Sequence, residues 1–157
     1  ELIKILAENK IKVIKSNFFN PELTLPKGDF TKIKPNKIDL INIKKGIKSL
    51  NNLNAHNHVQ GLVIRDNATI IQEPKRGTKK MLQSLKKSKN LSGILIKFPK
   101  RKQDLRVDLP TIGLDTLKDC NKANLKGIVL KSNQNIFMEK KKCLNFANKN
   151  KIFIKII

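Results

Sequence analysis

The residues best suited to chemistry lie in one short segment, Gln103 to Gly113, with the sequence QDLRVDLPTIG. Asp104, Arg106 and Asp108 alternate along it, and in an extended chain this spacing places all three side chains on one face. Two carboxylates on that face can hold a divalent cation or polarise water, and the guanidinium can bind phosphate through two parallel hydrogen bonds. From the spacing alone, a solvated loop with an internal Arg–Asp pair is the commoner outcome, and it stays open here.

A second candidate is the segment EPKRGT, from Glu73 to Thr78. It ends an apolar stretch and opens an expected helix, where free backbone N–H groups can bind an anion. Gly77 permits close approach of the backbone to such a ligand. The simpler interpretation is that Thr78 acts as an ordinary N-cap of the helix.

Other residue types that often carry chemistry are poorly placed. His56 and His58 flank Asn57, which is not the spacing of a helical zinc pair, and no Cys or acidic ligand lies nearby in the sequence. Cys120 and Cys143 are expected to be buried, reduced thiols on helices, which fits a cytoplasmic compartment. Because the chain has no Trp and no Tyr, we expect no specific nucleic-acid partner.

The elements that must position these segments follow from the hydrophobic pattern. In the first half we expect an opening amphipathic helix from Leu2, a strand over residues 11–16 and an irregular connection over 17–36. A helix capped by Asn36 and a hairpin that turns at Asp66–Asn67 follow. In the second half we expect a helix over 77–87, strands at 91–98, 126–132 and 152–157, and helices from 114 and over 139–148.

Strands and helices alternate in the second half at the spacing of βαβ units. The sequence therefore predicts one α/β domain over residues 1–157, with a mixed sheet and helices packed on it. The segment from Gln103 follows a buried strand, and ligands of open α/β sheets bind at the carboxyl ends of strands.

The formal net charge of +22 is the most unusual bulk property. Such a charge attracts nucleic acids, anionic lipid headgroups or phosphorylated substrates. Because the lysines are spread along the whole chain, a biased composition explains them as well as selection for an acidic partner does. No apolar run approaches the roughly 20 residues of a membrane-spanning helix. The chain begins with Glu1 and shows no signal peptide, so we expect it to start inside a longer protein.

The segment KFPKRKQDLRVDLPTIGLDT, residues 97–116, resembles the signature of LpxI-type UDP-2,3-diacylglucosamine pyrophosphatases, KxxKPGQDxRxDLPxIGxxT. Upstream, the stretch from Leu53 to Leu82 is similar to the family's GALDxGQ and EAxEGTDxML motifs, and the resemblance covers nearly the whole chain. The matching positions in the signature are Lys97, Lys100, Gln103, Asp104, Arg106, Asp108, Pro110, Gly113 and Thr116. The upstream matches are Gln60, Glu73, Gly77, Thr78 and Met81.

This resemblance implies a metal-dependent hydrolase, with Mg²⁺ as the expected divalent cofactor. It implies water attack at the α-phosphorus of UDP-2,3-diacylglucosamine, which releases UMP and 2,3-diacylglucosamine 1-phosphate in lipid A biosynthesis. The family has a second, N-terminal domain, with lipid bound between the two, and this chain matches the C-terminal domain alone. The expected partner is the acylated UDP-sugar substrate. Peripheral contact with the inner membrane and formation of a homodimer are further expectations to consider.

The resemblance also implies roles for single residues. Asp104, Asp108 and Arg106 are the expected catalytic residues, and the expected metal ligands are Asp104, Asp108 and Glu73. The expected substrate-binding residues are Lys97, Lys100, Gln103, Gln60, Gly77, Thr78 and Thr116.

The chain departs from the family pattern at several positions. Asn57, Arg76 and Lys79 stand where the family has acidic residues, Val59 replaces a Gly, and Arg101–Lys102 replace Pro–Gly. A cation near Glu73 would be repelled by Arg76 and Lys79. Three hypotheses therefore remain: an active hydrolase, a catalytically impaired anionic-lipid or phospho-sugar binding domain, and a nonspecific polyanion binder.

Overall fold

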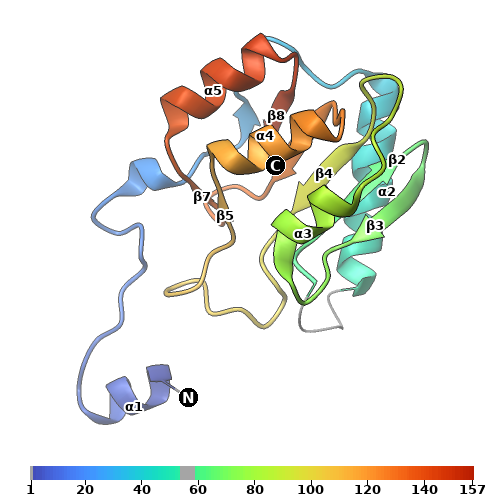
Figure 1. Ribbon diagram of the computed structural model, residues 1–157. Helices are drawn as coiled ribbons and strands as arrows, with labels where there is room; N and C mark the ends of the chain where they lie inside the picture. Colours follow the sequence, from blue (N-terminus) through green and yellow to red (C-terminus); the bar gives the residue numbers. More distant parts are fainter. Residues whose placement is uncertain (1, 54–58) are drawn as a thin grey trace.

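A mixed sheet of six strands forms the centre of the computed structural model, which describes residues 2–53 and 59–157 (Figure 1). The strands of this sheet are β1 (Gly28–Asp29), β2 (Gly61–Arg65), β3 (Ala68–Gln72), β4 (Ile94–Lys97), β6 (Gly127–Leu130) and β8 (Phe153–Ile156), in the order β1-β8-β6-β4-β2-β3. The helices are α1 (Leu2–Glu8), α2 (Lys37–Leu53), α3 (Gly77–Ser84), α4 (Leu114–Lys122) and α5 (Lys140–Lys149). A short helical turn, η1 (Pro21–Leu23), and a separate pair of strands, β5 (Thr111–Ile112) and β7 (Ile136–Phe137), complete the described elements.

The three central strands β4, β6 and β8 run parallel, whereas β2 runs antiparallel to β4 and to β3. Helix α4 connects β4 to β6 and α5 connects β6 to β8, as βαβ units require. The expected α/β fold with a mixed sheet and packed helices is therefore confirmed.

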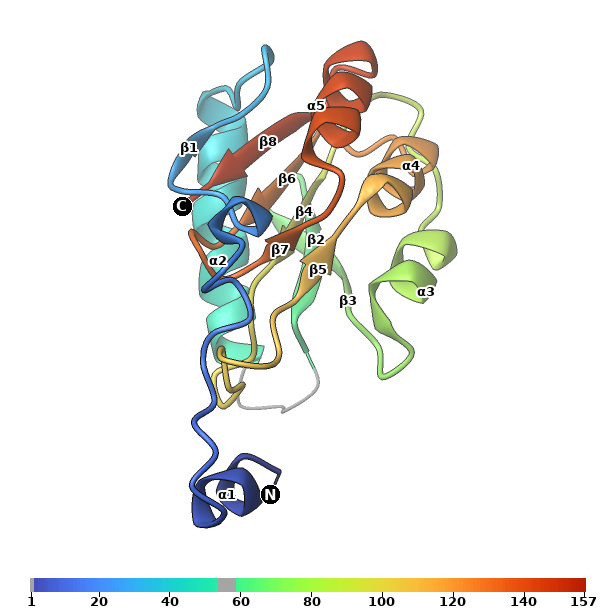
Figure 2. The ribbon, with the colours of Figure 1, turned by 90° about the vertical axis from the view of Figure 1, so that its left-hand side faces the viewer.

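Helices cover both faces of the sheet (Figure 2). Helices α3, α4 and α5 lie against one face, and α2 lies against the other. Alternate residues of each strand point into two separate apolar cores. Val63, Leu95 and Ile128 belong to the core under α3, α4 and α5, and Leu62, Ile96 and Val129 belong to the core under α2.

Helix α2 begins as the sequence predicts. Asn36 Oδ1 accepts a hydrogen bond from the Asp39 backbone N–H at 2.9 Å, and Asp39 Oδ2 accepts one from the Asn36 N–H at 2.8 Å. This reciprocal capping satisfies two backbone donors that the helix itself leaves free. The hairpin is also confirmed, since Asp66 and Asn67 at its turn have φ angles of 49° and 65°.

Several expected boundaries are wrong. Residues 11–16 form no strand in the structure, because the described residues supply no neighbouring strand, and Ile11 is 54% exposed there. Helix α3 ends at Ser84 rather than Lys87. The two-residue strands β1, β5 and β7 were not predicted, since so short a strand is defined by its long-range partner and not by its own pattern.

The segment that carries α1 projects away from the rest of the molecule (Figures 1 and 2). Its expected helix is confirmed, and the connection that follows exposes Ile14, Phe18 and Phe19 to solvent. No helix in residues 2–53 and 59–157 has the length and apolar character needed to cross a membrane.

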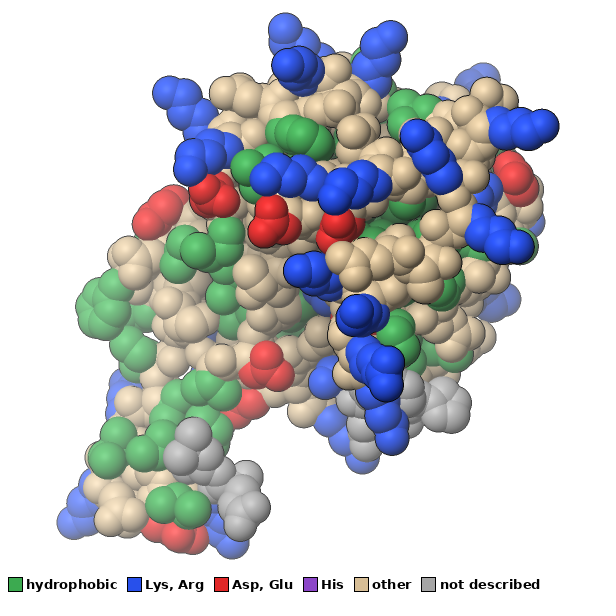
Figure 3. Space-filling model, viewed as in Figure 1, with side chains coloured by type: hydrophobic (Ala, Val, Ile, Leu, Met, Phe, Trp, Pro, Cys, Tyr) green, Lys and Arg blue, Asp and Glu red, His purple; other side chains and the backbone are tan. Residues whose placement is uncertain are grey.

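Basic side chains spread over the surface as the composition suggests (Figure 3). In that view Lys and Arg side chains line the upper rim and a vertical band near the centre, and a row of Asp and Glu side chains lies just below the rim at the upper left. Cys120 and Cys143 are buried free thiols on α4 and α5, as expected. Burial raises the pKa of the Cys120 thiol well above its ordinary range and that of the Cys143 thiol to about 11, so neither is an activated nucleophile.

Candidate functional site

The candidate site lies at the carboxyl end of β4, where three segments meet. The loop that follows β4 is bonded to the residue before β2, through the Phe98 N–H and the Gln60 carbonyl at 2.8 Å. The residue after β3 is bonded to the start of β2, through the Glu73 N–H and the Gly61 carbonyl at 2.8 Å. The antiparallel pairings of β2 with β3 and with β4 therefore bring Gln60, Glu73 and Lys97 to one end of the sheet.

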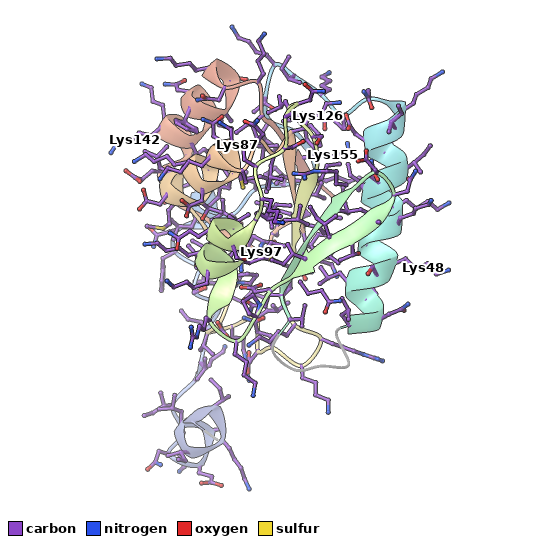
Figure 4. All side chains as sticks on the ribbon, turned by 45° about the vertical axis from the view of Figure 1, so that its right-hand side comes forward. Lys48, Lys87, Lys97, Lys126, Lys142 and Lys155 are labelled. Carbon is purple, nitrogen blue, oxygen red and sulfur yellow. The ribbon has the colours of Figure 1, made fainter. Side chains whose placement is uncertain are left out.

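Three of the predicted residues form a buried polar cluster. Lys97 Nζ lies 3.3 Å from Glu73 Oε1 and donates to the Thr78 hydroxyl, which in turn donates to Glu73 Oε1 at 2.7 Å. Lys97 and Glu73 are only 4% and 5% exposed. Figure 4 shows Lys97 inside the fold, close to α3, whereas its other labelled lysines project outward or lie near the far end of the sheet.

Burial lowers the pKa of Lys97 from its ordinary value, and the neighbouring Glu73 carboxylate opposes this shift. The other oxygen of Glu73, Oε2, is buried without a hydrogen-bond partner among the described residues. A Cβ on Gly61 would lie 3.2 Å from this oxygen, so the glycine leaves room for the carboxylate. Glu73 Oε1 is therefore shared by Lys97 and Thr78, whereas Oε2 bonds to no described residue.

A second pair of predicted residues fixes the loop above this cluster. Gln103 Oε1 accepts hydrogen bonds from Gln60 Nε2 and from the Lys100 backbone N–H, both at 2.8 Å. The amide nitrogen of Gln103 is buried and has no hydrogen-bond partner within residues 2–53 and 59–157. The arrangement holds residues 100–103 in a tight turn and keeps one amide donor free.

The loop does not extend at Asp104, contrary to the expectation that Asp104, Arg106 and Asp108 share one face. The Asp104 carbonyl accepts the backbone N–H groups of Val107 and Asp108, and its side chain accepts the Arg106 N–H at 3.0 Å. These local bonds close a turn, as Asp side chains commonly do. The Arg106 guanidinium donates to both Asp104 carboxylate oxygens, with Nε at 3.0 Å from Oδ1 and Nη2 at 2.7 Å from Oδ2.

This ion pair is the internal Arg–Asp pair that the sequence allowed as an alternative. The hydrogen bonds from Arg106 lower the pKa of Asp104 to about 2. Asp104 therefore stays ionised at any pH near neutrality, and Arg106 balances its charge.

The turn nevertheless brings both aspartates to one pocket. A pocket of about 410 Å³ is lined by Lys100, Lys102, Gln103, Asp104 and Asp108, and we call it the mixed-charge pocket. Two carboxylates and two ammonium groups around one hollow can hold a phosphorylated ligand and orient water beside it. Asp108 is exposed and forms no salt bridge with any described residue.

Other expected site residues lie elsewhere. Arg106 does not line the mixed-charge pocket, and neither does Thr116, which is half-buried in the first turn of α4. Gly77 has a φ of +84° and open space around it at the start of α3. The N-cap expected of Thr78 is wrong, because Arg76 holds that position and the Thr78 hydroxyl donates to Glu73 instead.

Asn135 is a positioning residue that no sequence pattern marked. It is 3% exposed, donates through Nδ2 to the Lys97 carbonyl at 3.1 Å, and accepts the Lys131 N–H at 2.9 Å. It thereby ties the end of β4 to the loop that follows β6. Its role depends on contacts between distant segments, and the local sequence around an Asn in a polar loop does not predict such contacts.

The donor set for a cation is smaller than expected. Among the described residues, no group of three or more His, Cys, Asp or Glu side chains could hold a metal ion. Asp104 and Asp108 share a pocket, whereas Glu73 is not in its lining and is paired with Lys97. Two carboxylates do fit Mg²⁺, which keeps several waters and uses substrate phosphates as further ligands. His56, Asn57 and His58 lie outside the described residues.

Comparisons with known proteins match this region and most of the fold. The model of the LpxI C-terminal domain family matches residues 26–155. The UDP-2,3-diacylglucosamine pyrophosphatase LpxI of Caulobacter vibrioides is 28% identical over 141 residues, which cover 85% of this chain. The chain spans 50% of the length of that relative. The family match includes the whole mixed-charge pocket, and on this ground the chain belongs to the LpxI C-terminal domain family.

Proposed function

We propose that this domain takes part in hydrolysis of the pyrophosphate bond of UDP-2,3-diacylglucosamine to UMP and 2,3-diacylglucosamine 1-phosphate in lipid A biosynthesis. The observation that carries this proposal is the convergence of Asp104 and Asp108 with Lys100 and Lys102 around one pocket. All four belong to the loop that resembles the family signature, although Lys102 itself replaces a family glycine. The name of the relative from Caulobacter vibrioides supports the substrate.

The residues of the pocket divide the work by charge. Lys100 and Lys102 attract the pyrophosphate and offset the negative charge that grows on it as water attacks. The carboxylates orient the attacking water and accept its proton, and Asp108 is the better candidate because Arg106 already donates to both oxygens of Asp104. Gln103, bonded to Gln60 and to the Lys100 backbone N–H, holds the loop that carries both lysines in place.

A divalent cation, in our proposal Mg²⁺, would be held by Asp104 and Asp108. It would supply further neutralisation of the pyrophosphate charge. Glu73 is better explained as the structural partner of Lys97. In this assignment no cation binds beside Glu73, so the positive charges of Arg76 and Lys79 do not count against the metal site.

The test is a phosphorus NMR assay of UMP release from UDP-2,3-diacylglucosamine by the complete protein with Mg²⁺. Asp108→Asn and Asp104→Asn should each lower turnover by about 10²- to 10³-fold, as loss of a preorganised electrostatic contact does. Asp115→Asn is the matched control, because Asp115 lies on α4 outside the pocket and its side chain is 92% exposed. Full activity of both pocket variants would refute the assignment.

A catalytically impaired phospho-sugar binding domain is the second candidate. It is favoured by the bidentate hold of Arg106 on Asp104 and by the loss of the family's acidic residues at Arg76 and Lys79. It predicts that the complete protein binds 2,3-diacylglucosamine 1-phosphate but releases no UMP in the same assay with ample Mg²⁺. A different result would indicate nonspecific polyanion binding. In that case the affinity for 2,3-diacylglucosamine 1-phosphate would fall steeply with salt concentration and would not change on substitution of Asp104 or Asp108.

A further inference from the structure

A second pocket adjoins the first and has a different charge. It has a volume of about 400 Å³ and lies between the loops that follow β4 and β6. Its charged lining residues are Lys100, Arg101 and Lys131, and no carboxylate of the described residues lines it. We call it the cationic pocket. Three positive groups that converge without an acidic neighbour create a site for a multiply charged anion.

None of these three cations forms a salt bridge with a described residue, and this distinguishes them from the buried Lys97 and from Arg106. Neutral hydrogen-bonding side chains stand beside them, namely Asn51, Gln103 and Gln134. Gln103 lines both pockets, and its buried amide nitrogen has no partner within the described residues. The two pockets thus share Lys100 and Gln103 as a common wall.

The cationic pocket continues into a third hollow of about 350 Å³, and both share Leu105 and Gln134. Lys15, Asn17, Ser132 and Asn133 supply the rest of its lining, and we call it the amide pocket. Its side chains offer hydroxyl and amide groups, and Leu105 is its one apolar lining residue among those described. Such a lining suits the hydroxyls and heteroatoms of a nucleoside and not an acyl chain.

We propose that the cationic pocket binds the phosphate of a nucleoside monophosphate, with the nucleoside in the amide pocket. The phosphate monoester is recognised by Lys100, Arg101 and Lys131, and the nucleoside by the polar groups of the loop 132–134. The identity of the nucleotide as UMP rests on the proposed hydrolysis, whereas the anion site itself rests on the geometry. Arg101 stands where the family motif has proline, so this part of the site is a feature of this chain.

The experiment is a calorimetric titration of the complete protein with UMP, with inorganic phosphate and with glucosamine 1-phosphate. UMP should bind more tightly than inorganic phosphate, since only UMP fills the amide pocket. Lys131→Ala and Arg101→Ala should each weaken UMP binding by about 5-fold at moderate salt, because each removes one charge beside a dianion. Lys87→Ala removes the same charge from an exposed position outside these pockets and should leave UMP binding unchanged.

Asn133→Ala separates the two parts of the site. It should weaken binding of UMP but not of inorganic phosphate, because Asn133 lines only the amide pocket. Equal affinity of UMP for the Lys131→Ala, Arg101→Ala and Lys87→Ala variants would overturn the proposal. If Lys131→Ala weakens binding of glucosamine 1-phosphate but not of UMP, the pocket binds the sugar phosphate. That result would overturn the nucleotide assignment.

These results do not depend on turnover. If UDP-2,3-diacylglucosamine is not hydrolysed but UMP binding still depends on Lys131 and Asn133, the proposed function fails and the nucleotide site stands. If hydrolysis depends on Asp108 but Lys131→Ala leaves the affinity for UMP unchanged, the proposed function stands and this inference fails. Urea denaturation of each variant tests whether unfolding is the cause. Lys131 and Arg101 have exposed side chains, whereas Asn133 has a φ of 55°, at which alanine is strained, so this control matters most for Asn133→Ala.

Discussion

Lys97 and Glu73 form a buried ion pair, with 3.3 Å between Nζ and Oε1 and with both side chains 5% exposed. The pair joins the last residue of β4 to the residue that follows β3, and the Thr78 hydroxyl bonds to both partners. Each of these two desolvated charges is stabilised by the other, so removal of one leaves the other buried and unpaired.

Removing either partner should therefore destabilise the fold. Lys97→Met and Glu73→Leu should each lower the free energy of unfolding by about 3–5 kcal/mol, the usual cost of an unpaired buried charge. The measurement is urea denaturation followed by far-UV circular dichroism. The double variant should recover much of the loss, because it leaves no charge in the cluster. Additive losses in the double variant would show that the two charges do not interact.

The bond between Arg106 and Asp104 sets the pKa of Asp104. Because Arg106 lowers the pKa of Asp104 to about 2, the folded protein holds this carboxylate ionised where an unfolded chain would begin to protonate it. The contribution to stability is present above the ordinary aspartate pKa and is lost as the pH falls toward 2.

Arg106→Ala should raise the pKa of Asp104 toward its ordinary value, as seen in the carboxyl carbon shift by NMR. Lys102→Ala should shift it much less, because Lys102 lines the same pocket but makes no bond to the carboxylate. An unchanged Asp104 titration in Arg106→Ala would show that the pair does not form in solution.

Asn36 should contribute measurably to the stability of α2. Asn36→Ala removes the side-chain acceptor for the Asp39 N–H and should cost about 1 kcal/mol in urea denaturation. Asp39→Ala should cost more, since Asp39 also pairs with Lys126, with 2.7 Å between Nζ and Oδ2. Asn52→Ala, at an exposed position of the same helix, is the control and should change little. A smaller cost for Asp39→Ala than for Asn36→Ala would contradict this order.

The sequence predicted the parts of the fold and of the site that depend on local pattern. The capping at Asn36, the turn at Asp66–Asn67 and the position of the loop after β4 all follow from residue type and periodicity. The turn at Asp104 was not predicted, because an alternation of polar and apolar residues also fits a loop whose side chains bond to their own backbone.

Partners across the fold could not be derived from local pattern either. Glu73 and Lys97 are 24 positions apart, and they meet only because β2 pairs with both β3 and β4. Family resemblance marked both residues but did not show that they pair with each other, since nothing in the motif shows which charged groups meet. The convergence of Lys131 with Arg101 depends likewise on the parallel pairing of β4 with β6.

Gly46 sets how closely α2 approaches the sheet. A Cβ at this position would overlap the Ile96 Cδ1 methyl and lie 3.2 Å from Ile64 Cγ2. Gly46→Ala should therefore destabilise the fold by about 1–3 kcal/mol through overpacking, less the gain of up to about 1 kcal/mol in helix propensity. Ile96→Val removes the methyl that the new Cβ meets and should by itself cost about 0.5–1.5 kcal/mol. In the Ile96→Val background, Gly46→Ala should become neutral or stabilising in urea denaturation. If Gly46→Ala costs the same in both backgrounds, the clash with Ile96 is not what keeps this position a glycine.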